Sequence, residues 1–345
     1  MTKLSRVTLA DVARAAGLSL GGASYALRAH PSIPAQTVER VRRLADALGY
    51  RPDLRISSLM ATIRRSRPLT ARETLAFVWI NTPKRTEKLP IHLQHYVRVI
   101  LHGARARADQ RGCDLEEFWL DERNLRPLRL HQILSARGIS GIVVSPAASD
   151  HAVVIDWDWR SFAAAIIGNT ECTPSLHRSA LYHYRSVWLT LERLRAEGFT
   201  RPAAILSRNV QDRIHSMQLA AFLTNHPVPK AAVDYVRFGL PEGFGELGPW
   251  LRRLAPDSLI LGWQVDERTV GLLRSWATKA RRIVTIDWHP HGVLPGIDPC
   301  NSEIAANAVD LVIAQLHRNE RGIPPRPTTL LLDGMWRETW KPDGV

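Results

Sequence analysis

Apolar residues at helical spacing dominate the first fifty residues of the chain. In the first two segments these residues are Leu9, Val12, Ala13, Ala16, Ala23, Ala26 and Leu27. Within each segment they fall on one face, because residues three and four apart lie side by side on a helix. Two helices of about two turns, joined by a short turn that contains glycine, form a helix-turn-helix unit.

Polar residues at the ends of both segments fit helix-capping positions. Thr8 precedes the first segment and Asp11 stands three residues later, which is a short carboxylate version of the capping box. Gly17 can adopt the left-handed conformation that ends a helix, and Ser19 is placed to cap the second helix. Neither helix can bury its apolar face alone, so a third helix must close a small core. The residues expected to supply it are Val38, Val41, Leu44, Ala45 and Leu48.

From Thr74 onward, short apolar runs alternate with helical patterns. The expected strands are 75–80, 114–120, 141–146, 163–169, 203–207, 233–238, 258–263 and 281–288, and residues 324–340 are expected to finish a strand. The expected helices are 95–112, 130–138, 186–199, 214–226, 250–255 and 269–280. Such alternation predicts parallel sheets with helices on both faces, and its two rounds predict two similar lobes. A ligand cleft is expected between them, at the carboxyl ends of the strands.

The predicted fold class is therefore α/β, with a small all-α helix-turn-helix headpiece followed by a two-lobed parallel-sheet domain. The expected boundaries are 1–50 for the headpiece, 51–72 for a linker and 73–345 for the two lobes. The linker, RPDLRISSLMATIRRSRPLTAR, is basic and too short for a stable isolated helix. It is either a disordered tether or a hinge helix that orders on DNA.

Charge is concentrated at the amino-terminal end. The chain of 345 residues has a net charge of +13, of which residues 1–72 contribute +9. A positive field on one small module is typical of nucleic-acid binding. Binding to a membrane surface is the competing explanation, but no long amphipathic helix combines this charge with a bulky apolar face.

Other classes of function are not supported by any motif. Cys113, Cys172 and Cys300 are far apart and odd in number, as expected of a protein in the reducing cytoplasm, with neither a disulfide framework nor a metal site. No apolar run reaches membrane-spanning length. His289 and His291 lack a carboxylate or thiol at metal-ligand spacing and are expected in an exposed loop. The chain shows no catalytic constellation, so we expect no enzyme activity, no cofactor and no metal.

The sequence also resembles a family. VTLADVARAAGLS, SYALR and TVERVRRLADALGYRPD, in this order and spacing, are similar to the start of a LacI/GalR-type transcriptional repressor. Looser similarity extends over the rest of the chain, in SARGISGIVVSP, RSVWLTLERLRAEGFTRPAAIL and TIDW followed by GIDPCNSEIAANAVDLVIAQL. The resemblance implies a homodimeric regulator that binds double-stranded operator DNA, with a sensor domain like a periplasmic sugar-binding protein. It also favours the hinge helix over the tether.

Family positions imply a set of DNA-binding residues. These are Thr8, Leu9, Ser19, Leu20, Gly21, Gly22, Ser24, Tyr25, Arg28, Thr37, Tyr50, Ile56 and Leu59. Hydroxyls and nearby backbone amides bind phosphate, whereas the second helix meets base edges in the major groove. Gly21 and Gly22 offer no side chain there and cost the helix about 1 kcal/mol each relative to alanine. Direct readout is therefore expected from Leu20 and Tyr25, with Arg28 as a further donor.

The resemblance also implies an effector site in the cleft. Its expected residues are Trp79, Asn81, Arg213, Trp263, Gln264 and Asp287. Arg213 stands where the family clamps ligand hydroxyls or carboxylates, and Trp263 and Gln264 stand where the family usually has Asn-Asp. Asp266 can substitute for that missing carboxylate, or the ligand differs. A carbohydrate is the candidate effector. The alternatives are a ligand-binding protein or an enzyme on the same two-lobed fold.

Overall fold

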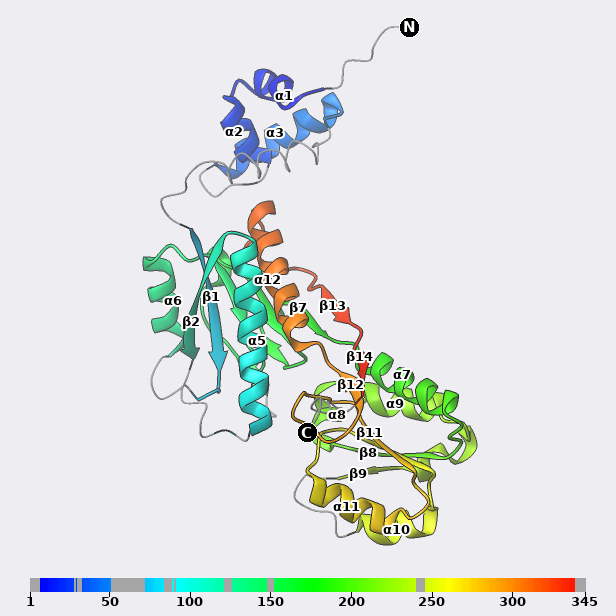
Figure 1. Cartoon of the computed structure of the whole chain (residues 1–345). Coiled ribbons are helices and arrows are strands. Elements are labelled where there is room, and N and C mark those ends of the chain that lie inside the picture. The colour runs from blue at the N-terminus through cyan, green and yellow to red at the C-terminus, as the bar shows by residue number, and fades with distance from the viewer. Residues whose placement is uncertain are drawn as a thin grey trace, which may run out of the picture.

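The computed structural model describes residues 7–27, 29, 33–50, 72–83, 89, 91–120, 126–147, 152–239 and 246–338. In this part of the chain, three helices form a headpiece at the amino-terminal end, and two α/β lobes follow it (Figure 1). The predicted fold class is confirmed. Arg28, Ile56 and Leu59, which were expected to contact DNA, lie outside the described residues, as does most of the linker.

The headpiece consists of α1 (Leu9–Ala16), α2 (Leu20–Leu27) and α3 (Ala35–Leu48). The expected capping box at α1 is confirmed, because the Thr8 N–H donates to Asp11 Oδ2 (3.0 Å) and the Asp11 N–H to Thr8 Oγ1 (3.4 Å). Gly17 ends α1 with a φ of 66°, in the left-handed region. Ser19 Oγ accepts the Gly22 N–H at 3.0 Å and so caps α2. Local signals therefore fix both helices of the unit.

The three helices close a small core. Its buried members are Val12, Ala16, Ala26, Val41 and Ala45. Tyr50 and Leu44 pack against this cluster from its edge. The expectation for Leu48 is wrong, since this last residue of α3 is 39% exposed, and Val38 is only half-buried and outside the cluster.

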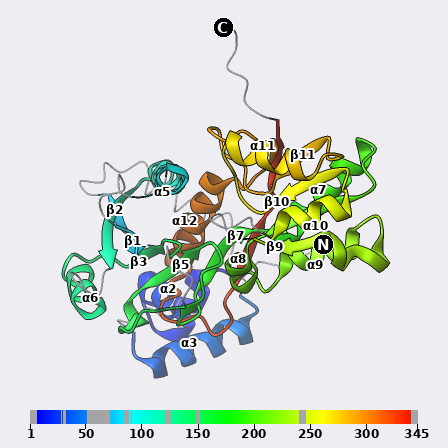
Figure 2. The same cartoon turned by 90° about the horizontal axis from the view of Figure 1, so that it is seen from below.

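The amino-terminal lobe is built on a parallel sheet of six strands. In spatial order they are β13 (Thr329–Leu332), β7 (His177–Leu181), β5 (Ala163–Ile167), β3 (Gly141–Val144), β1 (Glu73–Ile80) and β2 (Cys113–Leu120). One face packs against α6 (Pro127–Ala136), and the opposite face packs against α5 (Ile91–Gln110) and α12 (Asn301–Arg318) (Figure 2). Helices α5 and α12 approach closely, because a Cβ on Gly103 would lie 2.1 Å from the Ser302 carbonyl oxygen.

The carboxyl-terminal lobe repeats this plan. Its sheet, in spatial order, consists of β14 (Met335–Arg337), β12 (Gly296–Asp298), β11 (Arg282–Thr285), β10 (Ser258–Leu261), β8 (Pro202–Leu206) and β9 (Val236–Phe238). Only β14 among these strands runs antiparallel to its neighbour. One face carries α7 (His183–Ala196) and α9 (Met217–Asn225), and the other α10 (Leu247–Leu254) and α11 (Glu267–Trp276).

The chain passes between the lobes three times. These crossings connect β7 to α7, β12 to α12, and β13 to β14. Each lobe is therefore assembled from separated stretches of sequence, and the carboxyl ends of both sets of parallel strands face the space between the lobes (Figure 1).

Several expected boundaries are wrong in an informative way. The helix expected over 214–226 starts only at Met217, as α9, and a separate helix that was not expected, α8 (Arg208–Arg213), precedes it, with His215 and Ser216 at positive φ of 50° and 57° between them. The first half of the strand expected over 233–238 belongs to a 3₁₀-helix over Pro229–Tyr235, and only Val236–Phe238 form β9. The tail does not finish one strand but supplies β13 to one sheet and β14 to the other. Strand β7 was not expected.

Candidate functional site

The side chains that the structure describes on the second headpiece helix are mostly small, with Tyr25 as the large exposed one; the expected base contact Leu20 has its side chain outside the described part. Around Gly21 no atom lies within 4 Å of an added Cβ, whereas a Cβ on Gly22 would lie 3.2 Å from Ser19 Oγ. Tyr25 is 46% exposed, on the helix turn after Gly21 and Gly22. A major-groove partner would meet backbone and a phenol at this surface rather than a row of long polar side chains.

Of the other expected DNA contacts in the described headpiece, Ser24 lies in the middle of α2, and the rest lie at or next to helix ends: Thr8, Leu9, Ser19, Thr37 and Tyr50. Thr8 is exposed, and its hydroxyl donates to Asp11 Oδ2 at 2.7 Å. These contacts with Thr8 lower the pKa of Asp11, so its carboxylate stays ionised inside the cap. Thr37 lies in the first turn of α3, half-buried. Tyr50 follows the end of α3 and packs, partly buried, against the headpiece core.

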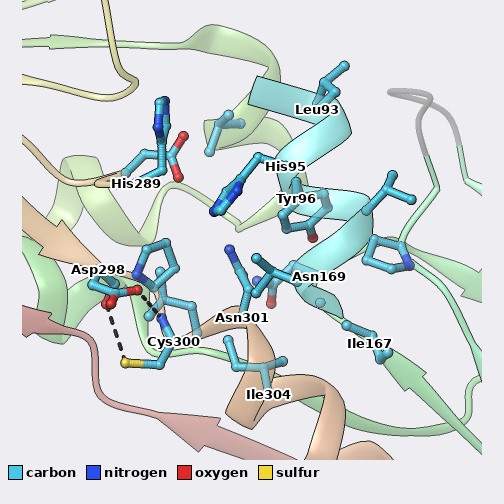
Figure 3. Close-up of a pocket in the computed structure, with 18 of the residues that line it drawn as sticks. Leu93, His95, Tyr96, Ile167, Asn169, His289, Asp298, Cys300, Asn301 and Ile304 are labelled. Carbon is cyan, nitrogen blue, oxygen red and sulfur yellow. Dashed lines mark hydrogen bonds between the residues drawn. The ribbon is translucent and has the colours of Figure 1, made fainter. Parts of the chain in front are cut away.

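A cavity of about 570 Å³ lies between the two lobes. The amino-terminal lobe lines it from α5 and from the ends of β1, β3 and β5, and the carboxyl-terminal lobe from α8 and the loop after β11. In Figure 3, His95 and Tyr96 of α5 face the side where His289 and Asp298 lie. The cavity is thus placed where the fold brings strand ends together, as the sequence predicts for a ligand site.

Positive charge enters the cavity from the carboxyl-terminal lobe. Arg213, the last residue of α8, lines it together with His183, the first residue of α7. Burial and the nearby Arg213 guanidinium lower the pKa of His183 to about 4, so this imidazole is neutral near pH 7. Tyr96 faces the same space, and its pKa is raised by burial and by the Asp287 carboxylate.

Two carboxylates also reach the cavity. Asp287 follows β11, and its backbone N–H donates to Thr285 Oγ1 at 3.1 Å. The surrounding protein raises the pKa of Asp287 to about 6, and the neighbouring Asp298 adds to this effect, although water still reaches the side chain. Asp298 is held by the backbone N–H of Cys300 (2.9 Å) and by Arg337 (3.2 Å). Asp287 is therefore the carboxylate that a ligand can engage without breaking an ion pair.

The six expected effector residues divide into two groups. Trp79, Arg213 and Asp287 line the cavity, and Trp79 Nε1 already donates to Glu117 Oε2 at 2.8 Å. The other three, Asn81, Trp263 and Gln264, are not among the described residues that line the cavity.

These three residues have other surroundings. Asn81 is exposed at a positive φ of 49°. Trp263 packs against the core between the carboxyl-terminal sheet and helices α10 and α11. Gln264 Nε2 donates to the Leu294 carbonyl at 3.2 Å. Asp266 caps α11 by accepting the Thr269 N–H at 2.8 Å, so its carboxylate is used within the helix rather than in the cavity.

Sequence reasoning missed several residues of this cavity. His95 approaches His289 and His291 across it, with ring centroids 6.0 and 5.5 Å apart. The expectation of an exposed loop holds for His291 but not for His289, which is half-buried and lines the cavity. His95 lies on an irregular part of the α5 pattern, and no local signal distinguishes it from a surface histidine. Within the described ranges, no three His, Cys, Asp or Glu side chains are grouped to hold a metal ion.

Comparisons with known proteins give a family match for the headpiece and structures of similar fold for nearly the whole chain. The model of a family described as bacterial regulatory proteins, lacI family, matches residues 8–53. A Lac repressor bound to ONPG in its repressed state superposes with a TM-score of 0.51 at 18% identity, covering 97% of this chain and 99% of that chain. At this identity the match shows a shared fold alone. No curated protein sequence matches the chain.

Two further structures are similar at lower scores. A Lac repressor dimer bound to operator and the anti-inducer ONPF has a TM-score of 0.49 and 17% identity, and covers 96% of this chain and 98% of that chain. A complex of the transcriptional regulator CelR with cellobiose has a TM-score of 0.48 and 14% identity, over 96% and 98% of the two chains.

A helix-turn-helix domain joined to a two-lobed fold with an interlobe cavity defines a DNA-binding transcriptional regulator. The match to the lacI-family model covers residues 8–53 of this chain, which form the headpiece. In the part of the chain that the structure describes, no helix is long and apolar enough to cross a membrane.

Proposed function

We propose that the protein is a repressor-type regulator whose operator affinity is set by a small effector in the interlobe cavity. The observation that carries the proposal is the position of that cavity. It lies beside two of the three chain crossings, where β7 passes into α7 and β12 passes into α12, so a ligand there contacts both lobes. A ligand that binds one arrangement of the lobes more tightly shifts the population toward it.

The proposed division of the chain follows the expected boundaries, with a headpiece at 1–50, a hinge at 51–72 and the sensor at 73–345. We propose that the headpiece works as one half of a homodimer. A two-fold dimer of helix-turn-helix domains binds two half-sites about one helical turn apart. The concentration of positive charge in residues 1–72 supports the same role, because it neutralises phosphate.

The proposed effector is a carbohydrate or a similar polar molecule with an apolar face. Arg213, Asp287 and Asn169 supply polar groups to the cavity. Much of the remaining lining is apolar, from residues such as Leu93, Val97, Ile167 and Ile214. A few convergent polar groups on a mostly apolar wall are typical of small-molecule sites. The structures of similar fold are complexes with ONPG, ONPF and cellobiose, which agrees with the carbohydrate class proposed for this effector.

The test combines selection of DNA with a screen of ligands. Duplexes retained from a random pool by the full chain should share two related half-sites. A panel of mono- and disaccharides is then added, and melting temperature and affinity for the selected duplex are measured. The effector should raise the melting temperature by mass action and change DNA affinity. An unenriched pool would contradict DNA recognition, and a panel that changes neither quantity would contradict the carbohydrate class.

Leu59 provides a sharper test of the DNA half, although it lies outside the described residues. The family resemblance implies that paired hinge leucines insert into the minor groove and kink the duplex, most easily at a central CG, CA/TG or TA step. Leu59→Ala should keep non-specific binding but lose the bend and much of the operator preference. Fluorescence transfer across the operator measures the bend, and an equal bend in both proteins would show that Leu59 is only a linker residue.

A ligand-binding protein without DNA activity and an enzyme on the same fold are the alternative functions. The lacI-family headpiece favours a regulator over both, because neither alternative needs a DNA-binding domain.

A further inference from the structure

We propose that His183 is a specificity-determining residue whose Nε2–H is held as a fixed hydrogen-bond donor toward the interlobe cavity, so that the effector presents an acceptor atom to it. The statement about the effector rests on the proposed function. The statement about His183 rests on a chain of hydrogen bonds inside the carboxyl-terminal lobe.

The chain of hydrogen bonds starts at the break between α8 and α9. Leu219 lies in the first turn of α9, where a backbone N–H has no acceptor within the helix. Ser216 precedes this helix but makes no side-chain cap. The acceptor comes instead from Gln211 of α8, whose Oε1 accepts the Leu219 N–H at 3.1 Å. A backbone N–H can only donate, so it fixes which end of the Gln211 amide faces α9.

This orientation is passed on through a second glutamine. Because Gln211 Oε1 faces Leu219, its amide nitrogen faces Gln218 and donates to Gln218 Oε1 at 2.6 Å. The Gln218 amide nitrogen then lies 3.2 Å from His183 Nδ1. Both glutamines are almost completely buried, at 1% and 3% exposed, so water does not offer them other partners. We name Leu219, Gln211, Gln218 and His183 the relay.

The relay determines the tautomer of His183. An amide NH₂ has no lone pair to accept with, so Nδ1 must be the acceptor and the proton of the neutral ring sits on Nε2. His183 lines the cavity as the first residue of α7. A helix amino terminus disfavours a positive charge, and so does the nearby Arg213. Burial and this guanidinium lower the pKa of His183 to about 4, so the ring stays a neutral donor near pH 7.

The consequence is that the part of the cavity wall formed by Arg213 and His183 only donates. Arg213 has five N–H donors and no acceptor, and the fixed His183 tautomer adds one more donor on the same side. An ammonium group placed there would face donors alone, whereas a carboxylate, carbonyl, ether or hydroxyl oxygen would be satisfied. The relay therefore favours effectors that place acceptor oxygens against this wall.

The tautomer can be read directly in the full chain, without DNA or effector. Histidine ¹⁵N labelling with long-range ¹H–¹⁵N correlation distinguishes a protonated from an unprotonated ring nitrogen, and His183→Phe identifies the signal. We expect Nε2 protonated and Nδ1 unprotonated, with no titration down to about pH 5. A proton on Nδ1, or titration at the ordinary histidine pKa of about 6.5, would overturn the proposal.

Gln218→Glu should reverse the hydrogen bond between residue 218 and His183 Nδ1 with almost no change of side-chain shape. A carboxylate beside Nδ1 accepts rather than donates, so the proton should move to Nδ1 and the pKa of His183 should rise by more than one unit. Gln315→Glu is the matched control, because Gln315 is 3% exposed but bonds Ala164 and Leu311 in the other lobe. An unchanged His183 signal in Gln218→Glu, or the same change in Gln315→Glu, would contradict the relay.

The acceptor requirement is tested with two fragments that share one apolar body. Benzoate offers acceptor oxygens and benzylammonium offers only donors. Benzoate should shift the His183 Nε2 resonance more than benzylammonium does, and the cavity response to benzoate should weaken in His183→Phe. Equal responses, or none to either fragment, would overturn the assignment of ligand chemistry. Because these measurements need neither DNA nor a saccharide, their failure is distinct from a failure of the proposed function.

Discussion

The headpiece and the two lobes differ in what fills their cores. The headpiece core contains two valines and three alanines, whereas the lobes completely bury side chains as large as Phe77, Phe162 and Phe222. Stabilisation by burial grows with the apolar area removed from water, so the headpiece gains far less per residue. A domain of this kind has little stability to lose, and its contacts with DNA become part of what keeps it folded.

The two regions differ equally in how their surfaces are made. In the headpiece, the surface proposed to meet base edges comes from one helix, α2, and its cap Ser19. The cavity draws on residues as far apart as Tyr96, Arg213 and Asp287, from both lobes. A local surface can be changed one side chain at a time, whereas the cavity depends on every element that positions its walls.

Removing residues 1–72 should have the largest effect, because it deletes one region and leaves the other. DNA binding should be abolished, while the lobes keep their fold and melting transition. In the full chain, if each dimer neutralises roughly 6–10 phosphates, affinity should fall ~10³–10⁵-fold between about 50 and 200 mM salt. Fluorescence anisotropy with a labelled duplex measures both. Tight duplex binding by the truncated protein would contradict the assignment of DNA binding to the headpiece.

Arg213→Ala should separate the regions in the opposite direction. Its guanidinium lines the cavity far from the headpiece helices, so DNA affinity without effector should remain. Affinity for the saccharide found in the screen should fall by about 10- to 100-fold, since a hydrogen bond to a charged group contributes roughly 1.5–3 kcal/mol. Calorimetric titration measures the loss. Arg208→Ala, on the exposed start of the same helix, is the control, and equal losses in both variants would argue against a cavity contact.

Val41→Ala and Val309→Ala compare the cores with one chemical change. Both valines are fully buried, in the headpiece and in α12 respectively, and each truncation should cost roughly 2 kcal/mol. In the headpiece this loss should remove hydrogen-exchange protection from α1, α2 and α3 together. In the lobes Val309→Ala should lower the melting temperature but keep protection. Retained protection in Val41→Ala would show that the headpiece is more stable than its core suggests.

Asp287→Asn should have the smallest effect, on the pH dependence of stability. The raised pKa of Asp287, about 6, means that the folded state holds a proton that the unfolded state releases near 3.8. The protonated carboxyl therefore favours the folded state below about pH 4, and this contribution is lost as pH rises through 6. Since water reaches the side chain, the effect should not exceed about 1 kcal/mol.

Urea denaturation at pH 5 and pH 7 measures this difference. Asp287→Asn should be more stable than the natural chain at pH 7, with the difference shrinking toward pH 4. His183 titrates in the opposite sense in both proteins, because its pKa is lowered, so comparison of the two chains cancels its contribution. A difference that grows toward acid pH would contradict the raised pKa.

The sequence predicts the headpiece well because its signals are local. Thr8, Asp11, Gly17 and Ser19 act within four residues of their partners, and all four take the expected capping or turn roles. The alternation of strands and helices also predicts both lobes. What it missed depends on partners far away in the chain, such as the division of the tail between two sheets.

Only some of the residues that line the cavity could be predicted from the sequence. Trp79, Arg213 and Asp287 line it, but Trp263 and Gln264 turn into the lobe because the loop around Gly292 packs against Gln264. His183 gave no signal in the sequence, since its proposed role depends on Gln211 and Gln218, which belong to two different helices. The break between α8 and α9, which the pattern did not predict, is what brings these glutamines together.

The three chain crossings have a consequence for synthesis on the ribosome. Strand β13 completes one sheet and β14 the other, and both lie after residue 328. Neither lobe can therefore be finished until residues 329–337 have emerged, whereas the headpiece helices end at Leu48. Domains generally fold as units as they leave the ribosome, amino-terminal first. The nascent chain thus carries a finished headpiece beside two incomplete sheets, until β13 emerges to pair with β7 and β14 with β12.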